Sequence, residues 1–138
     1  SRMNQSRGSF VLRTDGRRDH RPCRAGGGVW AQSHKTGSHN IVSGDLNNYS
    51  SWGGVVFGVE NSISAPNAMV LSGARNRAGG SMSSVTGGSY NTATGIYSTV
   101  NGGFGNRASG DFSTVAGGAQ RTAPGTHDWA AGGLFQDQ

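Results

Sequence analysis

The sequence has little of what most folds rely on. Its 138 residues include one cysteine, Cys23, which excludes a disulfide within the chain, and three prolines, too few for a collagen or a proline-rich linker. It contains no run of about 18 apolar residues, so no apolar membrane-spanning helix is expected. Only 33% of the residues are apolar. A conventional two-layer core would therefore lack Leu, Ile and Phe, and the fold must be thin, share its core with other chains, or be absent.

Acidic residues are also scarce, and charge is unevenly distributed along the chain. Residues 1–35 carry eight of the twelve Lys and Arg residues and two acids, whereas residues 36–138 carry four Arg and five acids. We therefore divide the chain into a basic N-terminal segment, 1–35, in which SFVL predicts a short strand, and a repeat region, 36–138. No signal peptide or anchor is visible, and we expect the sequence to be a fragment of a longer chain.

Glycine is abundant, with 25 residues, and it recurs at a fixed interval. The segments GGSYNTATGIYSTVN, GGFGNRASGDFSTVA and GGAQRTAPGTHDWAA follow one another over residues 87–131. Two weaker copies cover residues 57–86, and a fourteen-residue copy covers 43–56. A constant period of this length indicates stacked repeat units, about six to seven of them.

Each unit reads N-x-A-x-G-x-x-S-x-V-x-G-G-x-x. Alternation with period two predicts two short strands per unit, closed by glycines that supply the positive φ values of the turns. Ala and Val should point into a narrow interior, while parallel ladders join successive laps. The repeat positions of the three central units are Asn76, Ala78, Gly80 and Val85; Asn91, Ala93, Gly95 and Val100; and Asn106, Ala108, Gly110 and Val115.

The expected fold is thus all-β, a parallel β-roll, or β-solenoid, with laps of 14–15 residues. A helix is disfavoured because so many interior glycines would each cost about 1 kcal/mol. Each lap of such a roll buries little apolar area, so a lone chain is marginally stable and oligomerisation would stabilise it.

The units resemble the head repeats of trimeric autotransporter adhesins, the YadA-like head family. The shared motif is S-x-V-x-G, which recurs in consecutive units, and the resemblance covers residues 37–138. Most laps here have fifteen residues, whereas fourteen is commoner in the family. The matching residues are Ser83, Val85 and Gly87; Ser98, Val100 and Gly102; Ser113, Val115 and Gly117; and, less closely, Ile41, Ser43 and Gly44.

This resemblance implies a left-handed roll that assembles as a homotrimer and attaches a bacterium to host cells or extracellular matrix. The implied partners are collagen, fibronectin or laminin, or surface glycans, and the implied location is the bacterial surface, on a longer chain anchored in the outer membrane. Such a head works without catalysis, because many weak contacts add through avidity. The alternatives are a segment of a trimeric phage-tail or other extracellular fibre and, with less support, an ice-binding solenoid with Thr99 and Thr114 in register.

Two arginines are expected to point outward from one face of the roll. Arg77 and Arg107 share a column with Thr92 between them, which places them about 9–10 Å apart. The first interpretation is a weak basic stripe for an acidic glycan. The second is a solvated face, or contacts between chains with Glu60 or Asp111. We favour the second interpretation.

Aromatic residues are expected to form a second outward feature. Tyr97 and Phe112 share a column, and Tyr90 and Phe104 lie within one position of each other when the laps are aligned. A ladder of aromatic side chains would either bind a ligand or seal the trimer interface. We favour the trimer interface.

Glycine-rich stretches also suggest cofactor sites, which the context does not support. Gly103, Gly105 and Ala108 fit part of a dinucleotide-binding fingerprint, but neither the preceding buried strand nor the following helix is predicted. Calcium-binding repeats need acids where Asn106 and Arg107 stand. We therefore expect no cofactor.

Metal, catalytic and nucleic-acid sites are similarly unsupported. His127 and Asp128 are adjacent in an extended segment, so they would face opposite sides and make a poor catalytic pair. The arginines of the basic segment occur without a nucleic-acid-binding motif. The lone cysteine lacks zinc-site partners at suitable spacing, the histidines around it being His20, His34 and His39. We expect no metal, no enzymatic activity and no nucleic-acid partner.

Overall fold

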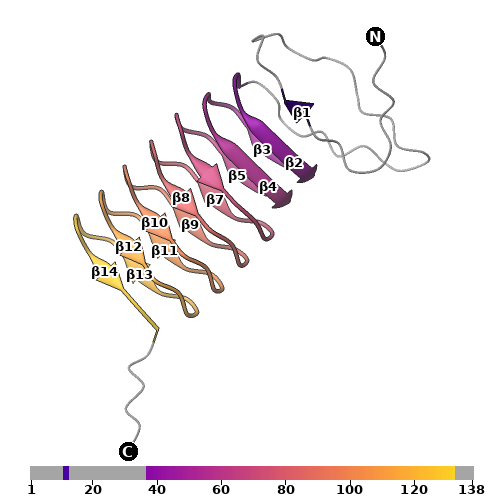
Figure 1. Cartoon of the computed structure of the whole chain (residues 1–138). Coiled ribbons are helices and arrows are strands. Elements are labelled where there is room, and N and C mark those ends of the chain that lie inside the picture. Colours follow the sequence, from indigo (N-terminus) through magenta and orange to yellow (C-terminus); the bar gives the residue numbers. More distant parts are fainter. Residues whose placement is uncertain (1–10, 13–36, 133–138) are drawn as a thin grey trace, which may run out of the picture.

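The computed structural model describes residues 11–12 and 37–132, which form a rod of stacked laps built from two sheets (Figure 1). Sheet A contains eight strands: β1 (Val11–Leu12), β2 (Ile41–Asp45), β4 (Val55–Val59), β6 (Met69–Val70), β8 (Ser84–Val85), β10 (Thr99–Val100), β12 (Thr114–Val115) and β14 (Trp129–Ala130). Sheet B contains six strands: β3 (Asn48–Tyr49), β5 (Ser62–Ile63), β7 (Arg77–Ala78), β9 (Thr92–Ala93), β11 (Arg107–Ala108) and β13 (Thr122–Ala123). The chain alternates between the sheets, so each lap contributes one strand to each.

From β2 onward, neighbouring strands of each sheet pair in parallel and are one lap apart. In sheet A, Val100 pairs with Val85 on one side and with Val115 on the other, and in sheet B Ala93 pairs with Ala108. These registers advance by 15 residues, whereas those from β2 to β4 and from β4 to β6 advance by 14. The prediction of an all-β parallel solenoid with laps of 14–15 residues is confirmed, with about six laps described.

The additional residue of the longer laps lies where sheet A approaches the corner that leads to sheet B. β2 and β4 are five residues long and pair along their whole length. From β6 onward each strand of sheet A has only two residues. Beyond these strands, successive laps pair again only at single bridges, such as that of Val59 with Ala74. The inserted residue therefore acts like a bulge, interrupting the strand while the ladder continues beyond it.

The core is a column of valines from sheet A that faces a column of alanines from sheet B. Small inward side chains let the two sheets approach closely without leaving voids. The predicted inward direction of the repeated Ala and Val residues is confirmed. The buried apolar residues are Val56, Val70, Val85, Val100 and Val115; Ile63, Ala78, Ala93, Ala108 and Ala123; and Ala68.

A second interior column consists of asparagines whose side chains connect one lap to the next. The Asn91 Nδ2 donates to the carbonyl of Gly87, 2.8 Å away, and to that of Gly103 in the next lap, 2.9 Å away. Its Oδ1 accepts from the backbone N–H of Asn106 at 2.9 Å. The column therefore satisfies backbone groups that the narrow interior would otherwise leave unpaired. Its members are Asn47, Asn61, Asn76, Asn91 and Asn106.

The expectation that the repeat glycines supply the positive φ values is wrong for Gly80, Gly95 and Gly110. None of the three has a positive φ; instead, a Cβ on each would overlap the carbonyl oxygen of the equivalent glycine one lap on. They are glycines because backbones meet there, not because the chain turns. The expectation is confirmed for another glycine column, because Gly73, Gly88, Gly103 and Gly118 have positive φ. Two further left-handed columns hold mainly larger residues: His39, Asn67, Met82, Tyr97, Phe112 and His127 at one corner, and Leu46, Glu60, Arg75, Tyr90 and Gln120 at the other.

The first lap of sheet A carries an antiparallel strand from the basic segment. β1 pairs Val11 with Val42 and Leu12 with Ile41, which agrees with the strand predicted within SFVL. The candidate zinc ligands Cys23, His20 and His34 lie outside the described residues, as do the rest of segment 1–35 and the last six residues of the repeat region. No helix within the described ranges is long and apolar enough to cross a membrane.

Candidate binding surfaces

The outward side chains of sheet B form a flat, polar surface. Pairing of Arg77 with Thr92 and of Thr92 with Arg107 confirms that the two arginines share a column. No exposed large hydrophobic side chain of the described residues lies on this surface. We call it the sheet B face, and it consists of Ser62, Arg77, Thr92, Arg107 and Thr122 with the adjoining outward column Ser64, Gly79, Thr94, Ser109 and Pro124.

The two arginines of the sheet B face are exposed, and the acids considered for them are engaged elsewhere. Glu60 forms an ion pair with Arg75, with 2.6 Å between Oε2 and Nε. Asp111 accepts through Oδ1 from the backbone N–H of Ile96 at 2.8 Å. Contacts of Arg77 or Arg107 with these acids in a second chain remain a prediction.

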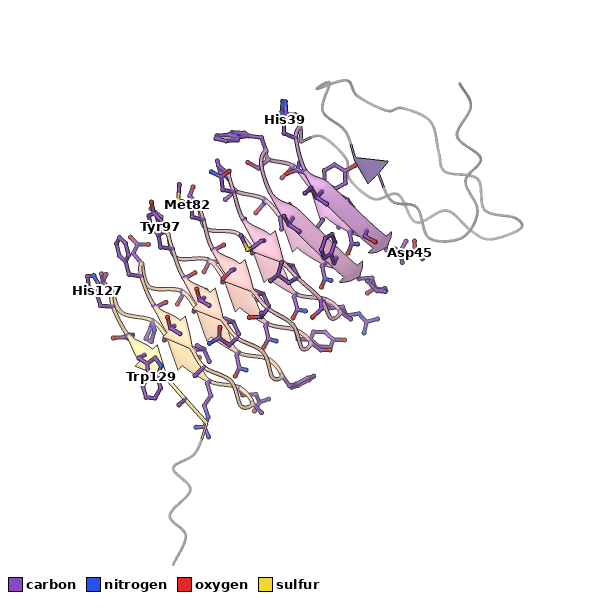
Figure 2. The ribbon with its side chains drawn as sticks, in the orientation of Figure 1. His39, Asp45, Met82, Tyr97, His127 and Trp129 are labelled. Carbon is purple, nitrogen blue, oxygen red and sulfur yellow. The ribbon has the colours of Figure 1, made fainter. Side chains whose placement is uncertain are left out.

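Aromatic rings stack along one edge of the rod. Tyr97 and Phe112 have ring centroids 5.3 Å apart and nearly parallel planes, and Phe112 and His127 repeat this arrangement at 5.2 Å. Met82 precedes them in the same corner column, and Figure 2 shows Met82, Tyr97 and His127 projecting from that edge. Phe112 is 51% exposed. We call Met82, Tyr97, Phe112 and His127 the corner ridge, and it confirms that Tyr97 and Phe112 share a column.

The opposite edge mixes charge with aromatic side chains, and we call Glu60, Arg75, Tyr90 and Phe104 the arginine corner. Tyr90 and Phe104 meet edge to face with centroids 5.5 Å apart, as their proximity in the sequence repeat predicted. Arg75 donates to Glu60 and, through Nη1, to the hydroxyl of Tyr90 at 2.6 Å. These hydrogen bonds, that to Glu60 first, raise the pKa of Arg75 above its ordinary value.

The outer face of sheet A is less uniform than that of sheet B. Its first half exposes Met69 and Leu71, and its last strand exposes Trp129, whose side chain lies on the outside of β14 (Figure 2). Between them, Thr99 pairs with Thr114. The threonine ladder is therefore two residues long, as the sequence indicated, and Ser84 and Trp129 end it.

The residues that suggested a cofactor or catalytic site have structural roles within the laps. Gly103 lies against the backbone of the next lap and Ala108 is buried in the core, so both belong to the repeat geometry. His127 stacks in the corner ridge, while Asp128 accepts from the backbone N–H of Gly125 at 2.6 Å. Within residues 37–132 and the strand at 11–12, no three His, Cys, Asp or Glu side chains lie close enough together to hold a metal ion.

Sequence reasoning missed several members of the two edges. Met82 and His127 belong to the corner ridge, and Arg75 belongs to the arginine corner. Counting fifteen residues back from Tyr97, on from Phe112 and back from Tyr90 would have found Met82, His127 and Arg75 respectively. The hydrogen bonds of the asparagine column were also not foreseen, although its regular recurrence was the available signal.

None of the protein-family models, curated proteins or solved structures compared with this chain matches it. A function for the chain therefore has to be argued from its repeat, its outward surfaces and the sequence motif S-x-V-x-G.

Proposed function

We propose that this chain is a head segment of a trimeric autotransporter adhesin of the YadA-like kind, displayed on a bacterial surface. It would be non-catalytic and would attach the cell to extracellular matrix proteins such as collagen, fibronectin or laminin, or to surface glycans. The observation that supports this best is a rod of stacked laps that places outward side chains at regular intervals, because regularly spaced contacts suit multivalent attachment.

The distribution of exposed apolar side chains supports assembly into a homotrimer. A cyclic trimer joins two different surfaces of each chain, since every copy contacts a neighbour on each side. The corner ridge and the arginine corner lie on opposite edges of the rod. The aromatic side chains of both are each about half exposed, for example Phe112 and Phe104. Exposed apolar patches of this kind are typical of protein–protein interfaces. The left-handed sense of the roll is part of the same proposal and rests on the S-x-V-x-G resemblance.

Binding of the intact chain to immobilised collagen, fibronectin and laminin tests the proposed function. The variant Phe112→Ser, which removes the central ring of the corner ridge, should lower the apparent affinity by roughly tenfold or more if attachment depends on several copies acting together. Ala116→Ser is the matched control, because it places the same side chain at an exposed position directly after β12.

The outcomes separate the adhesin from the alternatives. Binding to at least one matrix protein, weakened by Phe112→Ser and unchanged by Ala116→Ser, supports the adhesin. A trimer that binds none of the three proteins would contradict it and favour a fibre segment. Binding that is equally strong for both variants would contradict the multivalent mechanism.

A further inference from the structure

We propose that the sheet B face binds an extended, negatively charged glycan that lies along the axis of the rod. This inference deepens the proposed function, on which it rests, by naming the chemistry of one ligand and the surface that receives it. Charge, apolar surface and hydroxyl groups are divided unequally among the faces of the roll.

The sheet B face carries positive charge without negative charge. Arg77 and Arg107 project from its first column, and no acid lies in either of its columns. The four acids of the described residues lie elsewhere, and each has a partner of its own. Asp45 accepts from the N–H of Leu46, Glu60 pairs with Arg75, Asp111 accepts from Ile96, and Asp128 accepts from Gly125.

The spacing of the two arginines favours a long ligand over a small anion. They lie two laps apart with Thr92 between them, which corresponds to roughly 9.5 Å at the usual strand spacing. This is the spacing of the backbones, so guanidinium groups that extend straight out from the sheet are too far apart for one phosphate or sulfate group to contact both. An extended polymer with repeated carboxylate or sulfate groups can contact both, and guanidinium groups bind such anions through paired hydrogen bonds.

Hydroxyl groups between and beside the arginines suit a sugar. Thr92 lies between them in the column, and Ser64, Thr94 and Ser109 line the adjoining one. Each hydroxyl can both donate and accept a hydrogen bond, as sugar hydroxyls also do.

Gly79 is the one position without a side chain in the middle of the sheet B face. A Cβ placed on Gly79 would lie 3.4 Å from both Arg77 Nε and Ser64 Oγ and 3.5 Å from Thr94 Cγ2. A cation, a hydroxyl and a methyl group therefore surround a position without a side chain. Hydrogen-bonding groups of a sugar and the Arg77 cation can therefore meet here without an intervening side chain at position 79.

Other classes of partner fit this surface less well. Single-stranded nucleic acid is held by aromatic side chains on which bases stack, and the sheet B face has none. Protein interfaces are anchored by large apolar or aromatic side chains, which in the described part of this chain are exposed only on sheet A and the two edges. The same division leaves the sheet B face open when the edges are covered by neighbouring copies.

The test uses the intact chain and measures its binding to immobilised heparin and hyaluronan, which carry sulfate and carboxylate groups respectively. Arg77→Gln together with Arg107→Gln should lower the affinity roughly tenfold and make it less sensitive to salt, because two exposed charge contacts are lost. Arg17→Gln with Arg18→Gln, in the basic N-terminal segment, removes the same charge and should have little effect. A thermal melt of each variant checks that the fold is retained.

Three results would overturn the inference. They are no binding of the natural chain to either glycan, loss of binding in the Arg17/Arg18 variant but not in the Arg77/Arg107 variant, and equally tight binding to an oligodeoxythymidylate of similar charge. A trimer that binds a matrix protein but neither glycan would refute this inference and leave the proposed function standing. Arginine-dependent glycan binding by a chain that is monomeric would support the inference and contradict the trimeric assembly.

Discussion

Inward and outward positions of the strands differ in how much their residues vary from lap to lap. In sheet A the inward position is Val in five successive strands, β4 to β12, whereas the residue just before it is Val, Met, Ser, Thr and Thr. In sheet B, from β5 to β13, the inward position is Ile once and then Ala, while the outward neighbour is Ser, Arg, Thr, Arg and Thr.

The difference shows which positions the fold constrains and which it leaves open. Inward side chains must fit the same narrow space in every lap, and the asparagine and glycine columns must meet the next lap at fixed points. Outward side chains only have to suit a strand, so they can vary and carry recognition. Substitutions at neighbouring positions of one lap should therefore differ widely in their effects.

The largest contrast is expected within β10. Val100→Asp would place a carboxylate where the side chain is fully buried, and we expect a loss of more than about 4 kcal/mol in the free energy of unfolding, enough to prevent folding. Thr99→Asp, one residue earlier and facing outward, should cost about 1 kcal/mol or less. Circular dichroism with urea unfolding measures both. Similar losses for the two variants would contradict the assigned inward and outward directions.

The next contrast separates two asparagines of the same repeat unit, Asn91 and Asn101. Asn91→Ala would leave the carbonyl of Gly103 and the N–H of Asn106 without their side-chain partners, and we expect a loss of about 2–4 kcal/mol. Asn101→Ala, at an exposed position, should change stability by no more than about 0.5 kcal/mol. Urea unfolding at one fixed protein concentration compares them. If Asn91→Ala were as mild as Asn101→Ala, the asparagine ladder would not be stabilising.

Two adjacent glycines give a smaller contrast. A methyl group on Gly80 would overlap the carbonyl of Gly95, so Gly80→Ala should cost about 1–3 kcal/mol through displacement of a lap. A methyl group on Gly79 meets only ordinary contacts, and Gly79→Ala should be neutral or stabilising by about 0.4–1 kcal/mol. Melting temperatures rank the two variants. The reverse order would show that backbone approach does not select glycine at position 80.

The smallest effect on the chain's own stability is expected at the corner ridge. Phe112→Ser removes two ring contacts, which together contribute roughly 1–2 kcal/mol, and the exposed site leaves no cavity. The same change should lower the molecular mass in solution, while Ala116→Ser should leave it unchanged. A large loss of stability together with an unchanged mass would mean that the ring packs within one chain rather than between chains.

The interior of the roll was predictable from the sequence because the same residue types recur at the same inward positions of each lap. Period two gave the strands, and recurrence of Ala and Val every fifteen residues gave the core. The role of glycines such as Gly80 was not predictable, since distance between backbones of successive laps is a property of the stacked structure. The left-handed corners at Tyr97 and Phe112 were missed for a related reason: their residue types rarely adopt positive φ, and only the stacked lap imposes it.

The candidate surfaces were predictable in part. Column membership placed Arg77 with Arg107 and Tyr97 with Phe112, which the strand registers and ring contacts confirm. The ion pair between Arg75 and Glu60 depends on side-chain positions at a corner, which the repeat pattern does not specify.

In the proposed homotrimer, other copies of the chain cover the apolar edges of the rod. The molecular mass of the intact chain, measured by light scattering at several concentrations, tests this most directly. We predict a particle of three times the 14.2 kDa of one chain, stable on dilution. A well-folded particle of 14.2 kDa at every concentration would contradict it.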